Sequence, residues 1–125
     1  MAVLPELVIK EWKNRVGPIV FSTVGVDGIP NAIYATCVSI YNPEIIVVAD
    51  NRFDKTRKNI FNGSKGSILF ITEDKKSYQI KGSIEYHKTG EIFDDMKKWN
   101  PVNLPGNAAA ALKVEEVNSG SEKLI

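Results

Sequence analysis

Cysteine and histidine are almost missing from this chain, which has one of each, Cys37 and His87. A single cysteine excludes a disulfide within the chain, and nothing in its use indicates secretion. One cysteine and one histidine are also too few soft ligands to predict a structural zinc site. A hydrolase would have to build its catalytic site on His87, and no Gly-x-Ser-x-Gly segment is present to supply the nucleophile.

Net charge and long apolar runs are scarce as well. The net charge is +1, so the molecule as a whole exerts no pull on nucleic acid or on an anionic membrane. No apolar run approaches the ~20 residues of a membrane span, and residues 1–6 lack the basic-then-apolar pattern of a signal peptide. We therefore expect one cytoplasmic domain covering residues 1–125, with no membrane or nucleic-acid partner.

The familiar catalytic and nucleotide-binding motifs do not occur. The sequence contains neither Gly-x-Gly-x-x-Gly nor a Walker-type loop. It predicts no metal site, and no residue stands out as catalytic. Any demanding chemistry would then come from a bound cofactor.

Short apolar and β-branched runs follow one another along most of the chain and predict a mainly β fold with short helices. The predicted strands are residues 19–24, 31–41, 45–49, 67–72, 77–86 and 108–117. Turns at Asp27-Gly28 and Asn42-Pro43 make the first three a predicted meander. Gly82 interrupts the fifth strand and predicts a bulge or bend. Six strands of unequal length favour a small closed or partly open barrel over a sandwich.

Amphipathic periodicity predicts a helix at each end of this strand series. Residues 4–15 form the first, and residues 90–99, which end on Trp99, form the second. The apolar face of the first is expected to consist of Leu4, Leu7, Val8 and Trp12. The polar tail, residues 118–125, is expected to fray.

The most informative segment is residues 51–61, NRFDKTRKNIF, between the third and fourth strands. It predicts a short helix at 53–62 whose first turn carries Lys55 and Thr56. Free backbone N–H groups and the positive end of the helix dipole meet there, so cations and a hydroxyl in that turn suit a phosphate. A basic turn that only faces solvent is the alternative. The residues expected to face the core are Phe53, Ile60 and Phe61, and those expected to point away are Lys55, Lys58 and Asn59.

The order of these elements resembles the FMN-binding split barrels related to pyridoxamine 5'-phosphate oxidase, in particular their small members. Residues 20–31, VFSTVGVDGIPN, resemble the opening hairpin of that family, and residues 54–60, DKTRKNI, resemble its phosphate segment. Residues 82–84, GSI, are similar to its mid-barrel strand, and residues 109–117, AAALKVEEV, to its closing strand. The four stretches occur in the family's order.

This resemblance implies a six-stranded split β-barrel of Greek-key topology that forms a homodimer, with two FMN molecules in grooves between the subunits. It places the isoalloxazine ring along the strand residues Asn31, Ala32, Ile33 and Tyr34. It places the phosphate near Arg52, Lys55, Thr56 and Asn59.

Two aromatic residues have alternative roles under the same resemblance. Trp99 would either cover the partner's flavin or anchor its helix in the core. Tyr34 would either lie at the flavin edge or pack against side chains of neighbouring strands.

The chain departs from the oxidase itself in two places. Where the oxidase has Ser-Arg-Lys, this chain has Asp54-Lys55-Thr56, so one cation is missing unless Lys58 supplies it. Asp54 also places a carboxylate near the phosphate unless it caps the helix and points away. Residues 119–125, SGSEKLI, contain no arginine, whereas the oxidase's C-terminal tail uses one to grip the vitamin phosphate. These departures argue against oxidation of pyridoxamine phosphate.

Several functions remain compatible with the sequence. The chain could be an FMN-dependent oxidoreductase that transfers electrons or hydride, with electron donor and acceptor unknown, or a non-catalytic FMN-binding electron carrier. The cofactor could also be a deazaflavin or heme, because related split barrels are similar in shape. An OB-type barrel that binds single-stranded nucleic acid is the remaining alternative, disfavoured by the near-neutral charge. Its basic patch would be Arg52, Lys55, Arg57 and Lys58, and its stacking platforms Tyr34, Tyr41 and Phe53.

Overall fold

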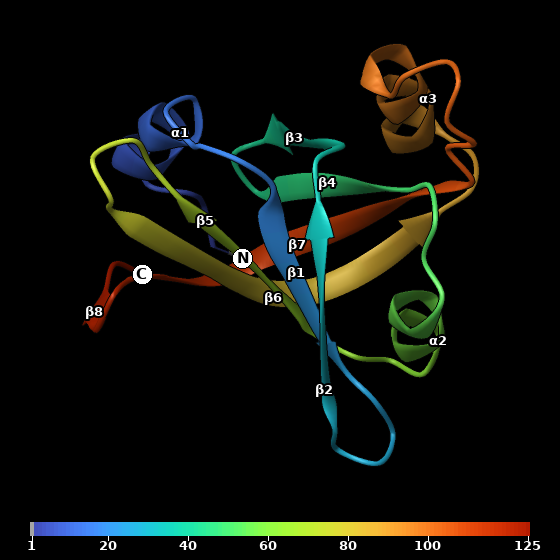
Figure 1. The fold of residues 1–125 in the computed structure, drawn as a ribbon, viewed down its shortest axis with the longest axis horizontal. Helices are drawn as coiled ribbons and strands as arrows, with labels where there is room; N and C mark the ends of the chain where they lie inside the picture. Colours follow the sequence, from blue (N-terminus) through green and yellow to red (C-terminus); the bar gives the residue numbers. More distant parts are fainter. Residues whose placement is uncertain (1) are drawn as a thin grey trace.

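A curled antiparallel sheet with three short helices makes up the structure (Figure 1). The computed structural model describes residues 2–125. The helices are α1 (Glu6–Trp12), α2 (Lys55–Phe61) and α3 (Glu91–Trp99). The strands are β1 (Ile19–Val24), β2 (Pro30–Ala35), β3 (Val38–Asn42), β4 (Ile45–Asp50), β5 (Gly66–Ile71), β6 (Ser77–His87), β7 (Ala108–Ser119) and β8 (Glu122–Lys123). Within residues 2–125, no helix has the length and apolar character needed to cross a bilayer.

The order of the strands explains the curl. It is β2-β1-β5-β6-β7-β4-β3, and every neighbouring pair is antiparallel. β2 and β3 lie at the two ends of this order, yet only Thr36 and Cys37 separate them in the chain. The sheet must therefore curl until its first and last strands approach each other, which makes it a split barrel. The predicted fold class, mainly β with short helices, is confirmed.

The strand count differs from the prediction, because residues 2–125 form eight strands where six were expected. The single strand predicted at residues 31–41 is wrong, because the chain turns a corner at Thr36 and Cys37. Val38 N donates to Thr36 O at 3.2 Å, and Ala49 N donates to Cys37 O at 3.0 Å. The predicted meander is also wrong, because β2 pairs with β1 and β3 pairs with β4 at opposite ends of the sheet. Neither corner residue is a usual turn former, so the sequence does not mark this corner.

The C-terminal tail is ordered, and the prediction that it frays is wrong. β7 extends to Ser119, and Gly120, with φ of +57°, turns the chain so that β8 pairs with the end of β7. Leu124 N then donates to Val117 O at 2.8 Å, and Leu124 packs against the core. A glycine adopts this left-handed conformation without strain, which allows so short a hairpin.

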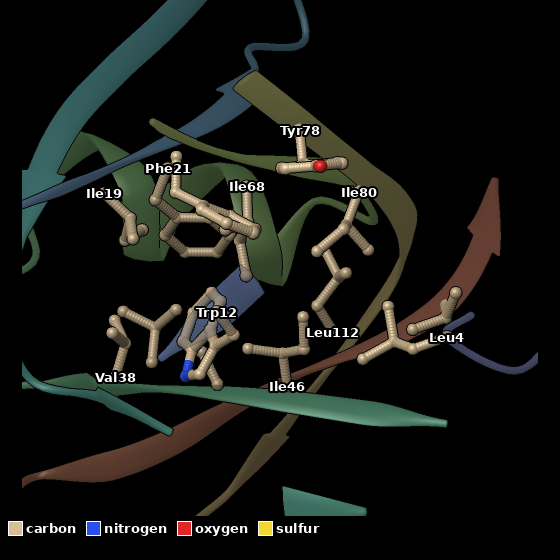
Figure 2. Close-up of a cluster of buried hydrophobic side chains, with 14 of the residues drawn as sticks. Leu4, Trp12, Ile19, Phe21, Val38, Ile46, Ile68, Tyr78, Ile80 and Leu112 are labelled. Atoms are coloured by element: carbon tan, nitrogen blue, oxygen red, sulfur yellow. The ribbon is translucent and has the colours of Figure 1, made fainter. Parts of the chain in front are cut away.

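The barrel interior and α1 share one hydrophobic core. Figure 2 shows Trp12 of α1 among side chains that come from several strands, including Phe21 of β1 and Ile46 of β4. Trp12 meets Phe70 of β5 edge to face, with ring centroids 5.1 Å apart. The predicted apolar face of this helix is confirmed for Leu4, Val8 and Trp12, which are buried. It is wrong for Leu7, which is 51% exposed.

β4 and the first half of β7 are buried on both faces, which explains the continuous apolar runs in their sequences. Every second residue faces the barrel core, for example Val48 and Ala110. The residues between them pack with Met96 of α3 in a second cluster that contains Ala109 and Ala111. Small alanine side chains allow the helix to approach the sheet closely.

α2 presents a different face to the core than the sequence predicts. Phe53, just before the helix, and Ile60 are buried, as expected. Phe61 is 60% exposed, because it lies in the last turn and stacks edge to face on Tyr86, with centroids 5.0 Å apart. Asn59 is buried instead, and its Nδ2 donates to Thr23 Oγ1 at 3.0 Å. The assignments of Phe61 and Asn59 are therefore wrong, because the hydrogen bond to Thr23 makes a buried polar residue favourable at position 59.

Candidate cofactor site

The beginning of α2 lies against β2, and a side-chain hydrogen bond joins the two elements. Asn31 Nδ2 donates to Thr56 Oγ1 at 3.2 Å, and the Thr56 side chain is buried. The Asn59 bond to Thr23 joins the next turn of α2 to β1 in the same way. The structure therefore brings together three residues that the sequence predicts for the site, Asn31, Thr56 and Asn59.

Two neighbouring hollows follow β2. The first, of about 400 Å³, lies between the β1–β2 hairpin and α2, and its predicted site residues are Asn31, Lys55 and Asn59. The second, of about 370 Å³, lies further along β2, and its predicted site residues are Ile33, Tyr34 and Arg52. Ala32 is exposed between them on the outer face of β2.

The two hollows differ in charge more than in polarity. Lysines line the first, Lys58 beside Lys55, together with amide side chains, the carboxylate of Asp27 and the apolar Val26, Ile29 and Pro30. The second has largely apolar walls, among them Ala49, Phe53 and Leu104. Along a single strand, a hollow that carries two lysines is thus followed by one with mostly apolar walls, which suits a ligand with a charged end and a flat apolar body.

Charge in the α2 segment is less available than the sequence indicates. Arg57 is bound to Asp50 through Nε and Oδ2, 2.7 Å apart. Lys58 Nζ lies 3.8 Å from Asp54 Oδ1 on the exposed side of the helix. In the part of the chain that the structure describes, Arg52 and Lys55 are exposed and form no ion pair.

These pairings bear on two hypotheses from the sequence. Asp54 precedes α2, but its side chain makes no capping hydrogen bond and instead neighbours Lys58. Asp54 thus partly neutralises the charge of Lys58, the residue suggested to replace the missing cation. The basic patch proposed for a nucleic-acid-binding barrel retains only Arg52 and Lys55 as unpaired cations among the described residues.

A buried carboxylate fixes the segment that carries these cations, and sequence reasoning missed it. Asp50, at the end of β4, has a side chain with no solvent exposure. Its Oδ1 accepts hydrogen bonds from Phe53 N at 3.0 Å and from Arg57 Nη2 at 2.9 Å. Its Oδ2 accepts from Arg57 Nε at 2.7 Å and from Tyr86 Oη at 2.5 Å. A signal was present, since Asp50 directly follows a buried apolar run and an arginine lies seven residues later.

This cluster changes the acid–base properties of its members. Burial by itself would raise the pKa of the Asp50 carboxyl, but the hydrogen bonds from Arg57, Tyr86 and Phe53 N outweigh burial and hold that pKa below 3.8. The bond to Asp50 raises the pKa of the Arg57 guanidinium. Burial, together with the same carboxylate, raises the pKa of the Tyr86 hydroxyl above 10.0. Asp50 is therefore an anion and Tyr86 a neutral donor at neutral pH.

A second polar contact that the sequence did not reveal holds the loop between α3 and β7 against the site. Asn51 and Asn100 exchange two side-chain hydrogen bonds of 2.9 Å each, and Gly106 N donates to Asn51 Oδ1 at 2.9 Å. Asn107 N also donates to Asp50 O at 2.9 Å. These bonds hold Leu104 as one wall of the second hollow.

Trp99 lines neither hollow within the chain, although the depression that it lines shares Thr36 and Cys37 with the second hollow. It packs in the cluster between α3, β4 and β7, and its Nε1 donates to Asp95 Oδ2 at 3.3 Å. With Cys37 and Pro101 it lines a separate depression. The structure of one chain thus agrees with the helix-anchoring alternative, while covering of a flavin by the partner subunit's tryptophan stays a prediction.

Known proteins resemble this chain in sequence and in fold. An uncharacterized protein of Methanocaldococcus jannaschii, MJ0282, is 29% identical over 119 residues, which cover 91% of this chain and 78% of that protein. The crystal structure of HupZ from Group A Streptococcus aligns with a TM-score of 0.80 and 22% identity over 93% of each chain. An FMN-binding protein from Syntrophomonas wolfei aligns with a TM-score of 0.74 and 21% identity over 92% of this chain and 91% of that one.

The two structural similarities show that the split-barrel fold is shared. The sequence model of the family described as pyridoxamine 5'-phosphate oxidase matches residues 7–119, which is nearly the whole chain. By this match, the chain belongs to the pyridoxamine 5'-phosphate oxidase family.

Proposed function

We propose that this protein is an FMN-binding flavoprotein that transfers electrons or hydride as a homodimer. One observation carries the proposal: a hollow lined by Lys55 and Lys58 and a hollow with mostly apolar walls, which Arg52 also lines, follow each other along β2. This arrangement matches a molecule with a phosphate at one end and a flat aromatic ring at the other. Family membership and the similarity to the Syntrophomonas FMN-binding protein support the same ligand.

The donor set fits the phosphate. Arg52 and Lys55 are exposed, and no carboxylate among the described residues pairs with them; Lys55 lines the first hollow, which Asp27 also lines, and Arg52 lines the second. Asn31 and Asn59 add neutral polar groups at the wall of the first hollow. In the bound protein these residues would hold the phosphate together with Thr56, and the backbone of β2 near Ile33 and Tyr34 would face the ring.

FMN supplies the redox chemistry when it is bound, and the protein's part is to bind and orient it. Phe53 and Leu104, which line the second hollow, would exclude water from one side of the ring. The bonds between Asn51 and Asn100 would keep that wall in place.

The outer surface of the sheet next to the hollows supports the proposed homodimer. Tyr34 of β2 is 78% exposed, and it lies in register with Val20 of β1, which lies in register with Leu69 of β5. Leu69 and Val24 are also 40% and 47% exposed. A row of apolar side chains across three strands is unusual at a free surface and suits contact with a second subunit. A partner there would also close the open side of the hollows.

The test is an absorption spectrum of the purified protein, followed by mass spectrometry of whatever a denaturant releases. We expect a flavin spectrum and the release of about one FMN per chain. A deazaflavin or heme spectrum would redirect the proposal to that cofactor. A colourless protein that also fails to bind added FMN would overturn it. Light scattering of the same sample should give the mass of a dimer, and a monomer at micromolar concentration would refute the dimer.

A further inference from the structure

We infer that Asp50 is the positioning residue that gives this site its preference for a phosphorylated flavin. The inference rests on the proposed FMN-binding function and deepens it. Asp50 would not touch the ligand. Its carboxylate would act by holding the cations of the α2 segment in place.

The Asp50 carboxylate links the two ends of the segment that carries the residues predicted to bind the phosphate. Its bonds to Phe53 N and to the Arg57 guanidinium tie residue 50 to residues 53 and 57. Arg52, Lys55 and Thr56 all lie inside the segment that is closed in this way. The two unpaired cations thus stand on a short stretch of backbone with its ends and its middle fastened to one buried group.

Tyr86 extends the same clamp to both ends of α2. Its hydroxyl donates to Asp50 Oδ2, beside the beginning of the helix. Its ring meets Phe61 edge to face, at the end of the helix. Because Tyr86 belongs to β6 in the middle of the sheet, α2 is anchored to the part of the barrel that is paired on both sides.

Energetics favour a geometric role for this pair, in which Asp50 is buried and the Arg57 side chain is 33% exposed. Removing a carboxylate and a guanidinium from water costs free energy that their attraction repays only when geometry is good. Replacement by apolar groups is often neutral or stabilising. Here each carboxylate oxygen of Asp50 accepts two hydrogen bonds, so the buried charge is fully satisfied. Asp50 does hold the Arg57 guanidinium in one orientation. Because the positive charge of Arg57 is paired with Asp50, it does not draw the phosphate away from Arg52 and Lys55.

The experiment compares FMN with riboflavin, which lacks the phosphate, in the full-length protein. Asp50→Asn keeps the size of the side chain but removes the charge that holds Arg57. We expect the dissociation constant for FMN to rise at least about tenfold and that for riboflavin to stay within about twofold. Arg57→Lys, which cannot make the forked contact, should shift FMN in the same direction by a smaller factor.

Two controls separate this role from general damage to the fold. Glu115→Gln breaks the exposed pair with Lys65, 2.7 Å long and outside both hollows, and should change neither dissociation constant. Thermal unfolding of each apoprotein reports whether the barrel survives. If Asp50→Asn does not fold, Arg57→Lys decides the question by the same FMN-to-riboflavin ratio.

The outcomes are distinct. Equal losses of FMN and riboflavin in the folded variants would mean that the pair supports the whole site and would overturn the inference. Unchanged affinities with a lower unfolding temperature would also overturn it and leave Asp50 a purely structural residue. Wild-type protein that binds neither ligand would overturn the proposed function, and this inference with it.

Discussion

Gly82→Ala should strongly destabilise the protein, because the β6–β7 bulge leaves no room for a side chain there. The register between β6 and β7 shifts between Lys81 and Gly82. A Cβ on Gly82 would lie 1.8 Å from Lys113 O and 2.8 Å from Lys113 C, whereas ordinary contacts begin at 3.4 Å. The obstacle is backbone in the most extensively paired strand of the sheet, so β7 would have to move by about 1.6 Å or break hydrogen bonds.

We expect a loss of about 3–5 kcal/mol in the free energy of unfolding, above the ~1–3 kcal/mol typical of overpacking, because the obstacle is backbone. For a domain of this size that loss corresponds to a fall in Tm of roughly 12–20 °C. Urea unfolding followed by circular dichroism gives the free energy, and a thermal scan gives the Tm.

Gly63→Ala is the matched control for this substitution. Gly63 has φ of +85° and no neighbouring atom within 4 Å of the added Cβ, so only backbone strain opposes the change. It should cost about 1–2 kcal/mol. Our steric reasoning would be refuted if Gly82→Ala unfolded within about 0.5 kcal/mol of the wild type, or cost no more than the control.

Three further predictions test the charges and the core. Lys55→Ala should weaken FMN by roughly tenfold to a hundredfold and leave riboflavin nearly unchanged, while Lys58→Ala, which removes a cation already paired with Asp54, should have a smaller effect; equal losses of both ligands for Lys55→Ala would refute the phosphate assignment. Because Asp50 has a lowered pKa in the folded state, its ionised form contributes stability that is present above pH 3.8 and is lost as the pH falls through the lowered value. Acid titration should therefore destabilise the wild type more steeply than Asp50→Asn below about pH 4, and parallel curves would contradict this. Leu112→Ala, at a fully buried position, should cost about 2–5 kcal/mol in urea unfolding, and a cost below about 1 kcal/mol would show that the barrel core collapses around the gap.

The sequence predicts those parts of the fold that turn residues and periodicity mark. The Asp27-Gly28 hairpin and the bulge at Gly82 both form where glycine makes them possible. The corner at Thr36 and Cys37 could not be predicted in this way. It exists because the sheet has to close, and closure depends on long-range pairing of β4 with β7 rather than on local sequence.

The sequence likewise predicts some features of the candidate site and not others. The proximity of Lys55 and Thr56 to Asn31 followed from the resemblance, and the structure brings these residues together. The orientation of α2 did not follow, because a seven-residue helix is too short for periodicity to decide which residues face inward. Tertiary partners decide it instead: Asn59 turns inward toward Thr23.

The two-residue corner between β2 and β3 also limits how far these two strands, the first and last of the sheet, can move apart. Two extended residues span only about 7 Å, so the seam cannot widen near Ala35, whereas the far end of β2 continues into a hairpin that extends away from the barrel (Figure 1). The gap between β2 and β3 should therefore open from the Pro30 end of β2, while the Ala35 end stays closed. Amide hydrogen exchange along β2 would be fastest near Pro30 and slow toward Ala35, and a ligand lying along the strand would flatten that gradient.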